Sequence, residues 1–120
     1  MRCLIVDDNV SFLEASCSLL EREGITVVGT ASTVADGVSR AEELAPDVVL
    51  IDIDLGEESG FSAARQLARL RSGAAPSLIL ISAHPEDDFA ELVVQSPAVG
   101  FISKTRLSAA AIRELLDGRT

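Results

Sequence analysis

The sequence has few cysteines, few basic residues and no long apolar stretch. Its two cysteines, Cys3 and Cys17, form neither a CxxC pair nor a ligand cluster, which argues against a disulfide framework and a thiolate metal site. Ten lysines and arginines stand against 19 acidic residues, and the net charge of −9 has the wrong sign for a surface that follows nucleic-acid phosphates. We therefore expect no nucleic-acid contact by this chain alone.

Membrane and secretion signals are also missing from the sequence. No apolar run approaches the ~20 residues that a membrane-spanning helix needs, and the start MRCLIVDD lacks the regions of a secretory signal. We expect a cytoplasmic, soluble protein with no membrane partner. The 120 residues, 48% of them hydrophobic, suit one domain with a substantial core, and no linker, repeat or low-complexity segment divides residues 1–120.

Apolar runs of strand length alternate with segments of helical periodicity along the whole chain. The expected strands are 3–6, 26–30, 48–53, 77–81 and 99–102, and the expected helices are 11–23, 33–44, 60–71, 86–95 and one that opens at Ser108. We expect Gly24 to end the first helix, Ser32 or Thr33 to cap the second, and Gly37 to weaken it.

This alternation predicts the fold class. Strands that are apolar on both faces and separated by helices require a parallel sheet covered on both sides, with right-handed crossovers. We therefore expect an open doubly wound α/β domain. In such sheets the ligand site lies beyond the carboxyl ends of the strands, where the strand order reverses.

Polar residues lie at the carboxyl ends of four of the expected strands. They are Asp7 and Asp8, Asp52 and Asp54, Ser82, and Lys104. A solvated charge run could explain one acidic pair, but not the coincidence of polar residues at four separate strand ends. Clustered carboxylates raise one another's pKa unless a cation lies among them, and oxygen ligands suit Mg²⁺. The charges therefore predict a divalent cation at this edge of the sheet.

Four segments that span the chain resemble the signature set of response-regulator receiver domains: IVDDN at 5–9, LIDIDLGEESG at 50–60, ILISA at 79–83 and GFISK at 100–104. The resemblance implies a (βα)5 flavodoxin-like sheet of strand order 2-1-3-4-5. It also implies a signalling phosphoacceptor, not an enzyme, which takes a phosphoryl group from a sensor histidine kinase. The acceptor is expected at Asp52, because Leu55 and Gly60 follow it at the third and eighth positions.

The resemblance extends to a magnesium site. It makes Asp8 the direct carboxylate ligand of Mg²⁺ and Asp7 the residue that holds a metal-bound water, while Asp52 is both ligand and acceptor. Asp54 is expected to supply its backbone carbonyl. Asp54 lies one strand period beyond Asp52 and would face the same way, so the sequence alone leaves an ambiguity between the two as acceptor. As an extra acid beside the acceptor, its carboxylate could compete for the metal or face solvent.

By the same resemblance, Lys104 pairs with the phosphoryl group, and Ser82 and Phe101 form the switch. The Ser82 hydroxyl would move to bond a phosphoryl oxygen, and the Phe101 ring would turn inward; plain core packing is the alternative for Phe101. The expected output surface is built from the fourth helix, the fifth strand and the fifth helix. Its apolar residues could form a phosphorylation-dependent homodimer surface or pack on the sheet: Leu92, Val93 and Ile112.

Several positions depart from the commonest receiver pattern, the extra acid Asp54 among them. Gly56 stands where proline is usual, which predicts a looser turn. Thr105, which follows the lysine, resembles the subfamily with a downstream helix-turn-helix effector, so transcription is the expected output. His84 could touch the mouth of the site and tune hydrolysis, or it could be an ordinary loop residue.

Other functions remain as alternatives at this point. A pseudo-receiver would keep the fold as an interaction module without phosphorylation. The Asp52-Ile53-Asp54 sequence is similar to the DxD motif of haloacid-dehalogenase-type phosphatases, but it lies on the third expected strand instead of the first. An EF-hand calcium loop would need a further ligand where Gly56 stands.

Overall fold

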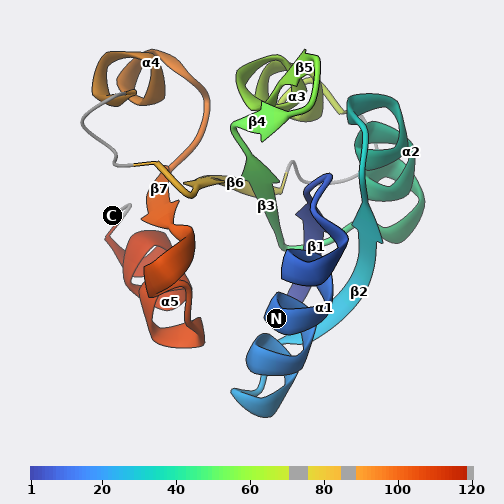
Figure 1. Cartoon of the computed structure of the whole chain (residues 1–120), viewed down its shortest axis with the longest axis vertical. Coiled ribbons are helices and arrows are strands. Elements are labelled where there is room, and N and C mark those ends of the chain that lie inside the picture. The colour runs from blue at the N-terminus through green and yellow to red at the C-terminus, as the bar shows by residue number, and fades with distance from the viewer. Residues whose placement is uncertain (71–75, 85–88, 119–120) are drawn as a thin grey trace.

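A computed structural model describes residues 1–70, 76–84 and 89–118 of the protein. Its centre is a five-stranded sheet, in which every neighbouring pair of strands is parallel. The strands are β1 (Arg2–Val6), β2 (Thr26–Ala31), β3 (Val48–Asp52), β6 (Ser77–Ser82) and β7 (Gly100–Ser103). They lie in the order β2-β1-β3-β6-β7, which can be followed from right to left in Figure 1. Counted along the chain without the small β4–β5 hairpin, this is the predicted order 2-1-3-4-5.

Helices cover both faces of the sheet, as the doubly wound prediction requires. The helices are α1 (Val10–Arg22), α2 (Val34–Leu44), α3 (Gly60–Leu67), α4 (Ala90–Gln95) and α5 (Ala109–Asp117). Side chains alternate between the faces of a strand, so Leu4 and Val6 of β1 join a core cluster with α2, α3 and α4. Cys3 and Ile5 join a second cluster with α1 and α5. The two core clusters hold the three layers together.

Helix caps lie where the sequence places them. The Thr33 side chain accepts a hydrogen bond from Asp36 N–H at 3.1 Å, so Thr33 and not Ser32 caps α2. Ser108 caps α5 by accepting from Ala111 N–H at 3.0 Å. Gly24, with φ of +92°, follows the end of α1 in the left-handed region that favours glycine.

Gly37, which was expected only to weaken α2, also has a role in packing. Gly37 is buried, and a Cβ atom there would lie 3.1 Å from a methyl carbon of Val6. The absence of a side chain therefore lets α2 approach β1 closely. Glycine lowers the helix propensity of α2, but it also allows a closer contact between this helix and the sheet.

Two short elements were not predicted from the sequence. A hairpin of β4 (Asp54–Leu55) and β5 (Glu58–Ser59) follows β3, and a 3₁₀ helix η2 (Lys104–Arg106) follows β7. Gly56 lies in the hairpin turn with φ of +65°, so the loop after β3 is an ordered hairpin and not the looser turn that was expected. Strands of two residues are too short to show a periodicity.

The middle helices differ from their predicted bounds. Helix α3 ends at Leu67, short of the predicted 71, and position 71 lies outside the described residues, as does the 86–88 start predicted for α4. Val93 and Ile112 are buried in the two core clusters, whereas Leu92 is half exposed. Of the three apolar candidates for an output surface, only Leu92 is thus available to a partner. No helix among the described residues is long and apolar enough to cross a membrane.

Candidate functional site

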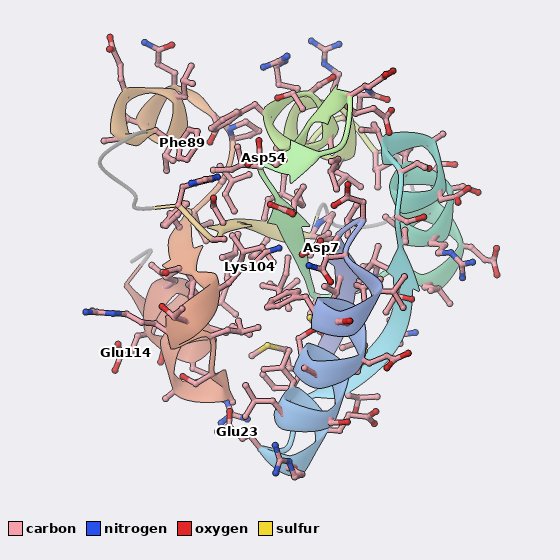
Figure 2. All side chains as sticks on the ribbon, in the orientation of Figure 1. Asp7, Glu23, Asp54, Phe89, Lys104 and Glu114 are labelled. Carbon is pink, nitrogen blue, oxygen red and sulfur yellow. The ribbon has the colours of Figure 1, made fainter. Side chains whose placement is uncertain are left out.

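The polar residues at the strand ends gather at one edge of the sheet. Asp7 directly follows β1, Asp52 ends β3, Ser82 ends β6 and Lys104 directly follows β7. Because all these strands are parallel, their carboxyl ends meet at the same edge. Figure 2 shows the Lys104 side chain extending from its strand end toward Asp7.

Asp52 lies in a buried and tightly packed position. Its relative exposure is 4%, and its carboxylate oxygen Oδ1 accepts a hydrogen bond from Asp54 N–H at 3.1 Å. Helix α3 begins against the backbone of this residue, since a Cβ atom at Gly60 would overlap the Asp52 carbonyl oxygen. Gly60 is therefore the residue that lets the helix approach the end of β3.

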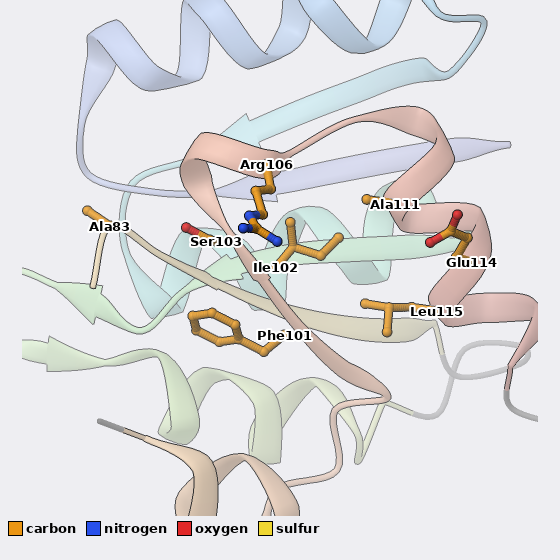
Figure 3. Close-up of a pocket in the computed structure, with 8 residues that line it drawn as sticks. All are labelled: Ala83, Phe101, Ile102, Ser103, Arg106, Ala111, Glu114 and Leu115. Carbon is orange, nitrogen blue, oxygen red and sulfur yellow. The ribbon is translucent and has the colours of Figure 1, made fainter. Parts of the chain in front are cut away.

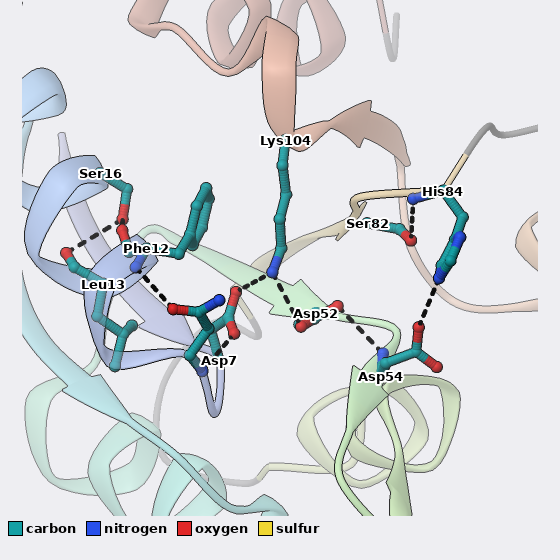
Figure 4. Close-up of polar contacts among 10 residues, drawn as sticks. Asp7, Phe12, Leu13, Ser16, Asp52, Asp54, Ser82, His84 and Lys104 are labelled. Atoms are coloured by element: carbon teal, nitrogen blue, oxygen red, sulfur yellow. Dashed lines mark hydrogen bonds and ion pairs between the residues drawn. The ribbon is translucent and has the colours of Figure 1, made fainter.

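Three carboxylates surround a small space beside Asp52. Asp7, Asp8 and Asp52 each direct one carboxylate oxygen to within 4.8 Å of the others, and Asp8 alone of the three is exposed. Lys104 Nζ lies 2.7 Å from Asp7 Oδ2 and 3.1 Å from Asp52 Oδ2, as Figure 4 shows. One ammonium group thus contacts two of the three clustered carboxylates, and the site keeps an excess of negative charge.

The electrostatics of the cluster shift two pKa values. Burial raises the pKa of the Asp52 carboxyl to about 6, and the charge of Asp7 adds to this effect, while hydrogen bonds from Asp54 N–H and Lys104 oppose it. For Lys104, burial works to lower the pKa, but the contacts with Asp7 and Asp52 outweigh it and raise the pKa above its usual range. Lys104 therefore stays charged, and Asp52 is ionised at neutral pH at a cost in free energy.

The donor set fits a hard divalent cation. Asp7 Oδ2 is fully buried and lies 2.7 Å from Lys104 Nζ, an ammonium that it shares with Asp52. Buried carboxylates are costly unless positive charge balances them, and one ammonium does not balance a cluster of three. Carboxylate oxygens without nitrogen or sulfur ligands suit Mg²⁺ or Ca²⁺ better than a softer metal.

Asp54 contributes its backbone to the site, not its side chain. The amide N–H bonds Asp52, while the carboxylate is 64% exposed and lies 3.8 Å from His84 Nε2. Of the two alternatives for the Asp54 carboxylate, the structure therefore supports the one in which it faces solvent. Asp52 and Asp54 are two residues apart, but the chain leaves the plane of the sheet between them, because β4 begins a hairpin at Asp54.

The two residues predicted to form a switch lie on neighbouring strands. Ser82 is fully buried, and its Oγ accepts a hydrogen bond from His84 N–H at 3.0 Å. Phe101 pairs in register with Leu80, packs against the α2–α3–α4 core and lines a cavity of about 600 Å³ together with Arg106. Figure 3 shows Phe101 on β7 among the residues that line this cavity.

Two contributors to the site were missed in the sequence. The Phe12 ring lies 4.5 Å from Lys104 Nζ, a cation–π contact that helps to hold the ammonium in place. Glu58 Oε1 accepts from Val34 N–H at 3.1 Å and ties the hairpin after Asp52 to the start of α2. Phe12 lies in the first turn of the helix that follows the acidic pair, and this closeness in sequence is the signal that could have suggested its role.

Comparisons with known proteins agree with this geometry. Residues 3–117 match the family described as the response regulator receiver domain. The chain is 32% identical to the transcriptional regulatory protein LiaR of Bacillus subtilis, over 91% of the chain and 51% of LiaR. It is also 32% identical to the response regulator GacA of Pseudomonas aeruginosa, over 99% of the chain and 56% of GacA. The chain thus spans about half the length of these relatives.

Solved structures show the same fold. A two-component response regulator of the LuxR family from an Aurantimonas species superposes with a TM-score of 0.85 at 28% identity, over 98% of this chain and 86% of that one. The signal receiver domain of NarL from Mycobacterium tuberculosis superposes with a TM-score of 0.82 at 27% identity, over 98% and 94% of the two chains.

Proposed function

The chain belongs to the response-regulator receiver family, and we propose that its buried Asp52 is the residue that accepts the phosphoryl group. It is a receiver domain of two-component response regulators, which is a signalling domain. The observation that carries the choice of Asp52 is its position between the acidic pair and Lys104. The Asp54 carboxylate, by contrast, is directed to solvent.

We assign the magnesium site to the same cluster. The carboxylates of Asp7, Asp8 and Asp52 would hold the ion, with Asp7 acting through a bound water and Asp54 through its backbone carbonyl. When bound, Mg²⁺ supplies positive charge that neutralises the phosphoryl oxygens and the carboxylates around them. The excess negative charge of the cluster, in which one ammonium is shared by Asp7 and Asp52, supports this assignment.

The side chains of this chain can carry the remaining chemistry. A carboxylate oxygen of Asp52 attacks the phosphorus of a phosphohistidine on a sensor histidine kinase. A P–O bond forms as the P–N bond breaks, and the histidine leaving group takes its proton from solvent. Lys104, already 3.1 Å from Asp52 Oδ2, would pair with the phosphoryl oxygens. The Ser82 hydroxyl would then donate to one of these oxygens.

Movement of Ser82 is the proposed origin of the signal. Ser82 and Phe101 lie on paired strands, and a shift of the hydroxyl toward the phosphoryl group vacates space that the Phe101 ring can enter. This changes the surface formed by α4, β7 and α5. Exposed Leu92 and Val94 on α4 offer apolar area there for a phosphorylation-dependent homodimer.

The proposed output is drawn from the relatives that the chain resembles. The chain spans about half of LiaR and GacA, and we propose that residues 1–120 form one receiver unit whose output is transcription through a DNA-binding domain outside this chain. The described receiver itself is proposed to assist its own phosphorylation and dephosphorylation without acting as an enzyme on other substrates.

Labelling by a small phosphodonor tests the proposal. With acetyl phosphate and Mg²⁺, the wild type and Asp54→Asn should each take up one phosphoryl group, and Asp52→Asn should take up none. Loss of labelling in Asp54→Asn alone would overturn the assignment of the acceptor. No labelling of the wild type would favour a pseudo-receiver, and rapid turnover of p-nitrophenyl phosphate would favour a phosphatase.

A further inference from the structure

His84 contacts three parts of the molecule that meet at the mouth of the site. Its backbone N–H donates to Ser82 Oγ at 3.0 Å, and its Nε2 atom lies 3.8 Å from Asp54 Oδ2. Figure 4 shows both contacts, with the imidazole directed toward the Asp54 carboxylate. The centroid of the imidazole is also 6.4 Å from that of the Phe89 ring.

Each contact leads to a different element. The N–H of Asp54 donates a hydrogen bond to Asp52 Oδ1. The contact between His84 and Asp54 therefore connects His84 with a residue that touches the acceptor carboxylate. Phe89 is the residue before α4, and its ring centroid is 6.5 Å from that of buried Phe61 at the start of α3. His84 therefore lies between the hairpin that follows Asp52 and the beginnings of α3 and α4.

Core packing does not account for these contacts. The His84 side chain is 62% exposed, and the Asp54 side chain is 64% exposed. An exposed imidazole has many rotamers available in solvent. Its place against both a carboxylate and an aromatic ring is what distinguishes His84 from an ordinary loop residue.

We infer that His84 is a positioning residue that holds Ser82 in its resting place and links the Asp52 site to the start of α4. The inference rests on the proposed phosphorylation of Asp52. A phosphoryl oxygen can only accept, so the Ser82 hydroxyl must turn its proton toward it. The segment from Ser82 to His84 follows that movement, because His84 N–H is bonded to the same oxygen.

The side-chain contacts of His84 then belong to the resting arrangement. As the segment moves with Ser82, the imidazole leaves Asp54 and Phe89, and the start of α4 loses a neighbour. A contact made in one of two arrangements biases the equilibrium between them, whereas a contact made in both would not. Removal of the imidazole should thus favour the phosphorylated arrangement before any phosphoryl group is present.

Beryllofluoride with Mg²⁺, a mimic of the phosphoryl group, provides the test. His84→Ala should bind beryllofluoride about two- to five-fold more tightly than the wild type, the range expected for a weak surface contact. In the metal-free variant, the Phe89 ring resonances should already lie part of the way to their beryllofluoride-bound positions. His84→Phe, which keeps a ring beside Phe89 but cannot pair with Asp54, should fall between the wild type and His84→Ala.

Glu57→Gln is the matched control. It removes one exposed charge from the same hairpin as Asp54, and it should change neither the affinity nor the Phe89 resonances. Wild-type affinity in His84→Ala, or Phe89 resonances that stay still in that variant, would overturn the inference. Beryllofluoride binding to Asp52→Asn as tight as to the wild type would instead refute the proposed function, so the two failures are distinguishable.

Discussion

Replacement of Asp52 by asparagine should stabilise the metal-free protein at neutral pH. Burial raises the pKa of this carboxyl to about 6 from the ordinary 3.8, so the folded protein disfavours the ionised form. Asparagine has nearly the same shape and keeps an oxygen that can accept from Asp54 N–H, but it does not ionise. Lys104 keeps Asp7 as an ion-pair partner in the variant.

The sign and the size of the effect follow from proton linkage. Well below pH 4, Asp52 is protonated in both the folded and the unfolded states, so the substitution does not change the free energy of unfolding through this group. Between about pH 4 and pH 6 the folded state holds a proton that the unfolded state releases, so wild-type stability falls as the pH rises. The difference between 3.8 and about 6 corresponds to about 3 kcal/mol, which is the largest gain expected above pH 6.

Urea denaturation in the presence of EDTA, repeated from pH 4 to pH 8, measures this gain. The free energies of unfolding of the wild type and Asp52→Asn should converge near pH 4 and diverge in favour of the variant up to about pH 6. Asp54→Asn is the control, because its exposed carboxylate should change stability by less than about 0.5 kcal/mol at any pH. A variant less stable than the wild type at pH 7.5, or a difference that does not vary with pH, would refute the reasoning.

Three further substitutions test the geometry around the site. Gly60→Ala should lower the free energy of unfolding by roughly 2–4 kcal/mol, since the added carbon overlaps the Asp52 carbonyl; unchanged stability in urea would contradict that packing. Glu58→Ala should lower the free energy of unfolding by about 1 kcal/mol, because the Val34 N–H loses its hydrogen-bond acceptor. Glu58→Gln should lower it by less because it keeps an acceptor oxygen, and equal losses in stability would argue against the capping role. Ser82→Ala should abolish the chemical-shift changes that beryllofluoride causes in β7 of the wild type, and equal changes in both proteins would exclude a coupling through this hydroxyl.

The strand order and the place of the site follow from the sequence because strong local patterns encode them. Runs such as 48–51 are apolar at every position, which only a strand buried on both faces explains. Once the strands are parallel, their carboxyl ends must share one edge. The meeting of Asp7, Asp52 and Lys104, which are far apart in the sequence, is a consequence of topology that the sequence pattern already contains.

Contacts of single side chains are a different matter. The direction of the Asp54 carboxylate depends on a hairpin of two-residue strands, and such short strands leave no periodic signal. The position of His84 beside Phe89, and that of Phe12 beneath Lys104, depend on how loops and helices pack after the sheet has formed. Pairs of this kind are set by three-dimensional proximity, which a linear pattern does not carry.

The most direct test of the account is to locate the phosphoryl group in the chain. After treatment of the wild type with acetyl phosphate and Mg²⁺, borohydride reduction converts an aspartyl phosphate to homoserine, which mass spectrometry of the digested peptides can place. The account predicts homoserine at position 52 and at no other aspartate. Homoserine at position 54, or at none of the aspartates of the cluster, would contradict it.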